Sequence, residues 1–335
     1  MSRPFRLSLL LPLLLCLSAC STLHAETHPG EATLIREVAT TTGKSPARLK
    51  ALLGGAQKQQ SIIDAMNRPA ESMAWSDYRK IFMTSTRVDD GIAFYREHQA
   101  LLDRVSAEYG VPASYLVAIL GVETNYGRVT GSYRVLDALV TLAFYYPPRA
   151  DFFRKELKTL LELPSDKLAG PLDSLQGSYA GAQGWGQFMP SSIKTYAVDA
   201  DHDGRIDLMD SLPDILASVA NYFHAHGWVK GGPVVVRAQV DDKAHAVEVD
   251  HSKPLYPVEQ FEAWGYAPLA EVNPGEPSTL LSLDGSDGSL DWLTFQNFYV
   301  ITRYNHSPMY AMVVHQLADA IAAGVKNDRM ARAAQ

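Results

Sequence analysis

The segment that decides the fold is VPASYLVAILGVETNYGR, residues 111–128. Its second residue is proline, which is common at the first position of a helix. Apolar residues between Leu116 and Val122 occupy nearly the whole circumference of the helix that follows. Such a helix has no polar face to turn toward water, so the sequence predicts a helix buried on all sides. The helix ends at Glu123, which places a carboxyl group at the end of a buried helix.

Glu123 is therefore a candidate catalytic acid. A carboxyl beside Ile119, Leu120 and Val122 loses hydration, and this loss raises its pKa. The negative end of the helix dipole also disfavours the carboxylate anion. Both effects keep the group protonated near neutral pH, as general acid catalysis requires. These residues alone leave open a second interpretation, in which Glu123 is a hydrogen-bonded structural glutamate.

Two further segments have the composition of a sugar-binding cleft. GSYAGAQGWGQFMPSS (177–192) combines glycines, which allow a ligand to approach the backbone, with amides and aromatic rings. FYVITRYNHSPMY (298–310) is rich in tyrosine. The alternatives are a glycine-rich structural turn and a set of core tyrosines. The candidate sugar-binding side chains are Ser178, Gln187, Tyr304, Asn305 and Tyr310.

The acidic segment DADHDGRIDLMD (199–210) has the spacing of an EF-hand calcium loop. Gly204 stands at position 6, where the loop turns sharply, and Ile206 at position 8 is the usual apolar anchor. Asp210 occupies position 12, where most EF-hands have glutamate, and this shorter side chain leaves the choice between Ca²⁺ and Mg²⁺ open. The alternative is a solvated acidic turn. The expected ligands are Asp199, Asp201, Asp203, the backbone carbonyl of Arg205, Asp207 and Asp210.

The N-terminus has the layout of a bacterial export signal. Two arginines precede an apolar run from Leu7 to Leu17, which is too short to span a bilayer comfortably. The sequence LSAC (17–20) then resembles a lipobox, which makes Cys20 the predicted lipidated first residue of the mature protein. The following residue, Ser21, favours the outer membrane of a Gram-negative bacterium. An ordinary secretory signal cut near Ala25 is the alternative.

Composition fits an ordinary globular protein. The chain has 335 residues, of which 47% are hydrophobic and 20% charged, so it can bury a sizeable core. The net charge of −7, with no long basic run, argues against a nucleic-acid partner. The only two cysteines, Cys16 and Cys20, lie in the signal region, which excludes thiol chemistry in the body of the protein. No organic cofactor motif is present.

The sequence resembles the membrane-bound lytic murein transglycosylase B family. The matching stretches occur in family order and span nearly the whole mature chain. Besides the acidic loop, they are QQSIIDAMNRPAE (59–71), GVETNYGR (121–128), GAQGWGQFMPSS (181–192), SVANYFHAHGW (218–228) and FYVITRYNHSPMYAM (298–312).

The resemblance implies a mainly α (α+β) fold in three parts: a lysozyme-like core carrying the EF-hand, an α-helical domain and a small β-rich subdomain. We expect the C-terminal helix, 309–325, to pack on the α-helical domain. The expected boundaries are a signal peptide at 1–19, a tether at 20–30, the α-domain at 31–105, the core at 106–230 with its EF-hand at 199–210, the β-rich subdomain at 231–290, and a return to the core at 291–335.

The resemblance also implies an activity. Members cleave the β-1,4 bond between N-acetylmuramic acid and N-acetylglucosamine in peptidoglycan without adding water, and they leave 1,6-anhydromuramoyl ends. Glu123 matches the single catalytic residue, acting first as acid and then as base. A hydrolytic muramidase on the same fold and a non-catalytic peptidoglycan-binding lipoprotein are the alternatives. Glycan strands are the expected ligand, and other cell-wall enzymes are candidate partners.

The cleft residues carried over by resemblance are the five named above together with Tyr78, Tyr222 and Arg149. One segment departs from the family pattern. Relatives can carry two adjacent arginines after the first proline of AFYYPPRA (143–150), on the peptide or muramoyl side of the site. Here Pro148 takes one of those places and only Arg149 remains, which puts the grip on the stem peptide in question.

Overall fold

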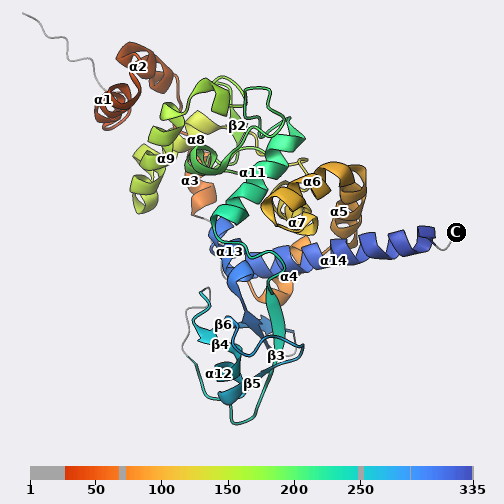
Figure 1. Ribbon diagram of the computed structural model, residues 1–335. Helices are drawn as coiled ribbons and strands as arrows, with labels where there is room; N and C mark the ends of the chain where they lie inside the picture. The colour runs from red at the N-terminus through yellow and green to blue at the C-terminus, as the bar shows by residue number, and fades with distance from the viewer. Residues whose placement is uncertain (1–26, 68–72, 248–252, 287, 334–335) are drawn as a thin grey trace, which may run out of the picture.

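The structure is a computed structural model that describes residues 27–67, 73–247, 253–286 and 288–333. It is mainly helical, with a five-stranded antiparallel sheet and a separate two-stranded one (Figure 1). The predicted signal peptide and Cys20 lie outside the described residues, as does most of the predicted tether. Within the described residues, no single helix is long and apolar enough to cross a membrane, and one pair of helices bent by 110°, Gln99–Tyr109 with Ala113–Thr124, passes that test only jointly.

Helix α7 (Ala113–Thr124) lies at the centre of the helical body. Ten of its residues are buried, among them Leu116 and Ala118 on opposite sides of the helix, so the predicted all-round burial is confirmed. Three residues in the left-handed conformation, Asn125, Tyr126 and Gly127, follow it and end the helix. The helices that pack on α7 are α5 (Ser85–Glu97), α6 (Gln99–Tyr109), α11 (Leu212–Ala225) and α14 (Pro308–Ala333).

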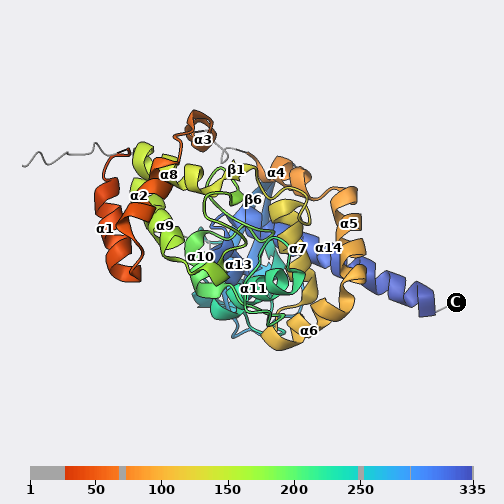
Figure 2. The same ribbon diagram turned by 90° about the horizontal axis from the view of Figure 1, so that it is seen from above.

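The region 31–105 is helical, but its helices attach to the rest of the molecule in two places. Its first helices contact the pair α8 and α9, whereas α4 and α5 contact α14. Figure 2 shows α1 and α2 at one end of the molecule and α5 and α6 toward the other. The helices concerned are α1 (Glu31–Thr42), α2 (Pro46–Gly54), α3 (Gln60–Met66), α4 (Trp75–Phe82), α8 (Val135–Tyr145) and α9 (Ala150–Glu162).

The C-terminal helix α14 extends beyond the predicted 309–325 and runs from Pro308 to Ala333. It contacts α4 and α5 as well as α7, so it joins the N-terminal helices to the core. The approach to α5 is close at Gly91, where an added Cβ would lie 2.6 Å from Ile321 Cδ1 and 2.5 Å from Tyr126 Oη. Glycine at this position therefore lets α5, α14 and the chain after α7 meet.

The five-stranded sheet forms the β-rich part of the molecule, with the strand order β4-β6-β7-β3-β5. Alternation along the strands gives the sheet two buried faces. Leu281 and Trp292 are paired across β6 and β7 and join the main core, while Leu280 and Leu293 join a second core with Phe261 of α12. These elements are β3 (Val235–Val240), β4 (Tyr256–Pro257), α12 (Val258–Ala263), β5 (Tyr266–Pro268), β6 (Pro277–Gly285) and β7 (Gly288–Thr294).

The glycine-rich segment lies between the two-stranded sheet and helix α10. Strand β1 pairs antiparallel with β2, and the segment that follows β2 closes on itself through the bridge between Gln183 and Phe188. Helix α13 then returns the chain from the five-stranded sheet to α14. The remaining elements are β1 (Tyr133–Arg134), the 3-10 turns Pro147–Arg149 and Ser165–Lys167, β2 (Gln176–Gly177), α10 (Pro190–Tyr196) and α13 (Gln296–Tyr304).

Candidate active site

Glu123 lies in the last turn of α7, partly exposed, with its carboxyl group in a largely desolvated setting. Its Oε1 accepts a hydrogen bond of 2.5 Å from the hydroxyl of Tyr310, the third residue of α14. Burial raises the pKa of Glu123 to about 7, although the hydrogen bond from Tyr310 acts in the opposite direction by stabilising the anion. A carboxyl with this pKa can both donate and accept a proton at neutral pH.

Three tyrosines from three separate elements surround this carboxyl. Tyr78 comes from α4, Tyr304 ends α13 and Tyr310 lies in the first turn of α14. Burial raises the pKa of each hydroxyl, and the negative charge of Glu123 raises it further. All three therefore remain neutral donors near pH 7. The hydroxyl of Tyr304 donates to the carbonyl of Gly186 at 2.5 Å, which fixes this ring against the glycine-rich segment.

The glycine-rich segment is held against the end of α7. The buried hydroxyl of Thr124 donates to the carbonyl of Trp185 at 2.9 Å. The indole of Trp185 lies so close to Gly127 that an added Cβ there would stand 2.2 Å from Cε2 of the ring. Gln187 takes a left-handed backbone conformation, and its Nε2 donates to the carbonyls of Thr130 and Gly184.

The other predicted cleft residues have local partners. Ser178 Oγ accepts hydrogen bonds from the backbone N–H groups of Ala180 and Ala182, and so shapes its own turn. The side chain of Asn305 is exposed and accepts from the N–H of Ser307 at the entry to α14. The structure thus places Ser178 in the glycine-rich segment and Asn305 directly after Tyr304.

Tyr222 and Arg149 differ from the tyrosines around Glu123. Tyr222 is 8% exposed, and its hydroxyl donates to the carbonyl of Arg303 at 2.6 Å. Its ring packs against Tyr304 with centroids 4.8 Å apart, so its direct contact is with a residue of the site. The guanidinium of Arg149 is exposed and stacks on Phe152 and Phe153 at the start of α9.

The acidic loop brings three carboxylates together. Oxygen atoms of Asp199, Asp201 and Asp203 lie within 4.8 Å of one another. Asp199 Oδ1 is buried and has no hydrogen-bond partner in the described part of the chain, as expected for an oxygen that coordinates a cation. Gly204 has a φ of 88°, which permits the sharp turn predicted at this position. The donor set fits a hard cation such as Ca²⁺.

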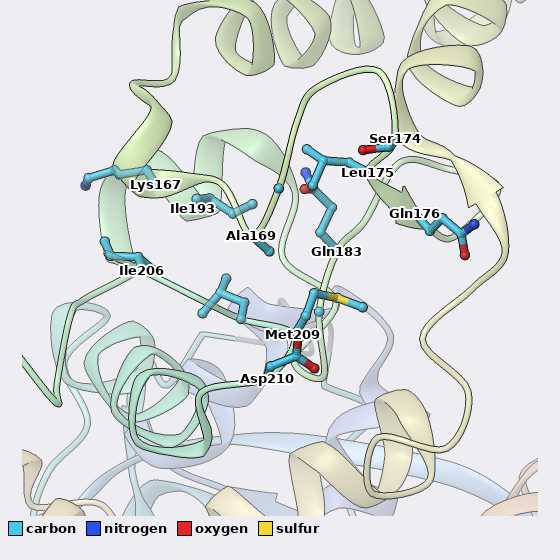
Figure 3. A pocket seen from close by; sticks show the side chains of 13 residues that line it. Lys167, Ala169, Ser174, Leu175, Gln176, Gln183, Ile193, Ile206, Met209 and Asp210 are labelled. Carbon is cyan, nitrogen blue, oxygen red and sulfur yellow. The ribbon is translucent and has the colours of Figure 1, made fainter. Parts of the chain in front are cut away.

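The two remaining carboxylates of the loop lie differently. Asp207 Oδ1 accepts from the backbone N–H groups of Met209 and Asp210, and so closes the end of the loop. The side chain of Asp210 is exposed. Asp210 also lines a cavity of about 320 Å³ between the acidic loop and the glycine-rich segment, and this cavity is lined by Gln183 but not by Glu123 (Figure 3).

Sequence reasoning missed the residues that anchor these segments. Asp214, 1% exposed on α11, accepts from the N–H groups of Ala200 and Asp207 and so braces both ends of the acidic loop. Ile206, the predicted apolar anchor, donates its N–H to the carbonyl of Asp166 at 2.6 Å. The sequence could have indicated Asp214, because acidic residues are common in the first turn of a helix. Its hydrogen-bond partners could not be predicted, because they depend on how the acidic loop folds back onto α11.

The fold and the site together define a class of protein. A helical body holds one desolvated carboxyl with a pKa near 7 among neutral tyrosines, next to an aromatic, glycine-rich segment. This is the arrangement of a glycan-cleaving enzyme in which a carboxyl group performs acid–base chemistry.

Comparison with known proteins identifies the family. The family model for the transglycosylase SLT domain matches residues 27–319, and the chain belongs to this family. The membrane-bound lytic murein transglycosylase B of Escherichia coli (strain K12) is 42% identical over 305 residues, which cover 88% of this chain and 83% of that protein. The protein is therefore a peptidoglycan lytic transglycosylase, as its sequence motifs predict.

Solved structures confirm the lysozyme-like fold. The soluble lytic transglycosylase SltB1 from Pseudomonas aeruginosa matches with a TM-score of 0.83 and 45% identity, over 88% of this chain and 99% of that one. The E. coli lytic transglycosylase Slt35 in complex with calcium matches at 0.81 and 41%, over 89% and 94%. SltB3 from P. aeruginosa in complex with NAG-anhNAM-pentapeptide matches at 0.76 and 31%, over 88% and 79%.

Proposed function

We propose that Glu123 is the single catalytic acid and base of this transglycosylase. The observation that carries the proposal is the pKa of about 7 that burial gives this carboxyl, in hydrogen-bond contact with Tyr310. In the described part of the chain, no second carboxylate is among the groups that shift the pKa of Glu123 or of the tyrosines around it. Ordinary glycosidases require a pair of carboxyl groups, so a one-carboxyl site favours an internal nucleophile.

The proposed reaction has two steps. Protonated Glu123 first donates its proton to the glycosidic oxygen that links N-acetylmuramic acid to N-acetylglucosamine, and the bond to carbon 1 breaks. The sugar's own acetamido group stabilises the positive charge that develops. Glu123, now a carboxylate, then accepts the proton of the carbon-6 hydroxyl as that oxygen bonds to carbon 1. The product carries a 1,6-anhydro ring, no water is consumed, and Glu123 regains its proton.

The surrounding tyrosines support this cycle. Tyr310 donates to Glu123 Oε1 and so stabilises the carboxylate that exists between the two steps. Tyr78 and Tyr304 remain neutral, so we assign them to hydrogen bonding with the sugar.

We assign the other cleft residues by their place around this site. The segment that contains Ser178, Gln187 and Trp185 supplies a backbone fixed by hydrogen bonds within the segment and to the carbonyl of Thr130. Asn305 is exposed next to Tyr304 in the chain, and Tyr222 packs edge-on against the ring of Tyr304. Arg149, free of an acidic partner among the described side chains, is available for a carboxylate of the stem peptide.

We further propose that the acidic loop binds Ca²⁺. The clustered carboxylates and the unpartnered Asp199 Oδ1 support this, as does the calcium complex of Slt35. Bound calcium would neutralise the repelling carboxylates and thereby stabilise the loop. The proposed ligands are Asp199, Asp201, Asp203, the carbonyl of Arg205, Asp207 and Asp210.

The site of action follows from the N-terminus. We propose that lipidated Cys20 tethers the enzyme to the periplasmic face of the outer membrane, where glycan strands lie within reach. The E. coli relative is membrane-bound, and SltB3 holds a peptidoglycan fragment that carries a pentapeptide. Both facts support a membrane-tethered enzyme acting on cell-wall glycan, with other cell-wall enzymes as candidate partners.

Mass spectrometry of digested peptidoglycan tests the proposed reaction. We expect anhydromuramoyl ends, lighter by one water than reducing ends, and we expect Glu123→Gln to produce none while still folding and binding glycan. Glu156→Gln is the matched control, because Glu156 is a buried glutamate whose carboxylate accepts from the backbone N–H and the hydroxyl of Ser191 on α10. Reducing ends would indicate a muramidase, intact glycan a binding protein, and turnover by Glu123→Gln would exclude the assigned acid.

A further inference from the structure

The carboxyl of Glu123 lies at a place where helices are usually least fixed. It is the penultimate residue of α7, and the last turn of a helix lacks the hydrogen bonds that continue the ladder. Three left-handed residues follow at once, so the chain reverses directly after the catalytic turn. The position of the carboxyl therefore depends on whatever anchors this end of the helix to the rest of the site.

Thr124, the last residue of α7, provides such an anchor. It is 1% exposed, and its Oγ1 takes part in two short contacts: it donates to the carbonyl of Trp185 at 2.9 Å and accepts from the N–H of Gly127 at 3.0 Å. The carbonyl of Leu120 in the same helix lies farther away, at 3.3 Å. The single hydroxyl hydrogen thus favours the contact that leaves the helix, and Thr124 joins the helix end to the glycine-rich segment.

The acceptor of this bond is itself fixed. The N–H of Trp185 donates to the carbonyl of Leu208 in the acidic loop at 3.1 Å, and the indole packs on Gly127. The next residue, Gly186, accepts from the hydroxyl of Tyr304 at 2.5 Å. The backbone of Trp185 and Gly186 therefore contacts the end of α7, Tyr304 and the acidic loop, and it fixes their positions relative to one another.

We propose that Thr124 is a positioning residue of the transglycosylase, which holds Glu123 in line with the glycosidic oxygen through its hydrogen bond to the Trp185 carbonyl. The proposal rests on Glu123 being the catalytic acid and base. Thr124 does not touch the sugar; it acts by fixing the backbone from which the neighbouring carboxyl extends. Because small displacements of a catalytic group slow the chemical step far more than they weaken binding, its loss affects kcat and leaves KM nearly unchanged.

The test uses isosteric and conservative variants of Thr124 with a soluble glycan fragment as substrate. We expect Thr124→Val, which keeps the shape but removes the hydroxyl, to lower kcat by about tenfold or more with little change in KM. Thr124→Ser keeps the hydroxyl and should remain within about threefold of wild type. In Thr124→Val the freed carboxyl gains water, its pKa falls toward the ordinary value, and the alkaline limb of the rate profile moves to lower pH.

Thr141→Val is the matched control. Thr141 is also a fully buried threonine whose hydroxyl bonds the backbone: it accepts from the N–H of Gln59 at 2.9 Å and donates to the carbonyl of Gln57 at 3.4 Å. These contacts join α8 to the N-terminal helices. We expect this variant to lose stability while keeping kcat and the pH profile, when both variants are assayed below their measured melting temperatures.

The outcomes for the threonine variants and for Glu123→Gln are distinguishable. Wild-type kcat and pH profile in Thr124→Val, with only a lowered melting temperature, would make Thr124 purely structural. Thr124→Cys, which keeps the size and offers a weak donor, should give an intermediate kcat and serves if the valine variant does not fold. If Glu123→Gln were active, the proposed catalytic role would fail first; if that variant is inactive and Thr124→Val is unaffected, only the positioning role fails.

Discussion

At the scale of the residue, two opposed influences set the chemistry of Glu123. Burial favours the protonated acid, whereas the hydroxyl of Tyr310 favours the carboxylate, and the resulting pKa is about 7. A group whose proton affinity matches the ambient pH can serve as acid in one step and as base in the next. The balance depends on one hydrogen bond between side chains 187 residues apart in sequence.

Removing that hydrogen bond should move the pH profile. In Tyr310→Phe the carboxylate loses its donor, so the pKa of Glu123 rises above 7 and the acid form persists at higher pH. We expect the alkaline limb of kcat to shift upward by about one pH unit or less, together with a fall in kcat. Tyr266→Phe is the control. It removes a hydroxyl that donates to the His245 carbonyl in the β-rich part, and it should leave the alkaline limb of kcat at its wild-type pH. A downward shift in Tyr310→Phe would contradict this account.

The raised pKa also makes stability depend on pH. The pKa of Glu123 is about 7 in the folded protein against 4.5 for an ordinary glutamate, so its stabilising effect is complete below pH 4.5 and is lost as pH rises through 7. Glutamine does not titrate. The free energy of unfolding of Glu123→Gln should therefore exceed that of wild type by on the order of 2 kcal/mol above pH 8, and the difference should vanish near pH 4. Denaturant titrations at both pH values check this, and a difference independent of pH would refute it.

At the scale of the element, the acidic loop and the glycine-rich segment form one connected unit. Asp214 of α11 braces both ends of the loop, and the Leu208 carbonyl receives the N–H of Trp185. Burial raises the pKa of Asp214, although the hydrogen bonds that its carboxylate accepts from two backbone N–H groups act in the opposite direction. Anything that stabilises the acidic loop therefore also stabilises the segment packed against the end of α7.

Calcium should raise the melting temperature of the protein through this unit. Adding Ca²⁺ to metal-stripped protein should raise the melting temperature by several degrees, because binding to the folded state stabilises it by about 2.7 kcal/mol at 100 times Kd. Asp199→Ala combined with Asp203→Ala should abolish the increase. Asp241→Ala combined with Asp242→Ala, two exposed aspartates of another loop, should preserve it. An unchanged wild-type melt would remove the calcium assignment.

At the scale of the whole molecule, three segments meet at Gly91. Helix α5 carries this glycine, α14 brings Ile321 to it, and the turn after α7 brings Tyr126, whose hydroxyl donates to the Arg87 carbonyl. The same α14 carries Tyr310, the partner of Glu123, in its first turn. The spacing of α5 and α14 therefore fixes both a core contact and the direction from which Tyr310 approaches Glu123.

Gly91→Ala tests this junction by the sign of its effect. Helix propensity alone would make alanine more stable than glycine by up to about 1 kcal/mol. The new Cβ would lie 2.5 Å from Tyr126 Oη and 2.6 Å from Ile321 Cδ1, so we expect instead a loss of about 1–3 kcal/mol. Gly54→Ala, at the end of α2 with its nearest atom 3.8 Å away, should be neutral or stabilising. A stabilised Gly91→Ala would show that the junction is loosely packed.

The sequence by itself determined the local features of this protein. The apolar circumference of 113–124 predicted the buried helix, and the position of Glu123 predicted a raised pKa. The spacing of the acidic loop predicted an EF-hand, of which the structure shows three clustered carboxylates. Family motifs in order along the chain predicted the fold and the transglycosylase activity, which the comparisons confirm. These features are legible because helix periodicity and loop spacing depend on residues only a few positions apart.

Only the tertiary structure decided which groups meet. It brought Tyr310 to Glu123, turned the Tyr222 hydroxyl toward a backbone carbonyl, and joined Thr124 to Trp185 and Asp214 to the acidic loop. Each of these contacts joins separate elements of the fold. Such contacts have no periodic signature, because they depend on how helices and loops pack against one another and not on neighbouring residues in the chain. The sequence therefore supplied the proposed catalytic group, and the packing of distant segments supplied its environment.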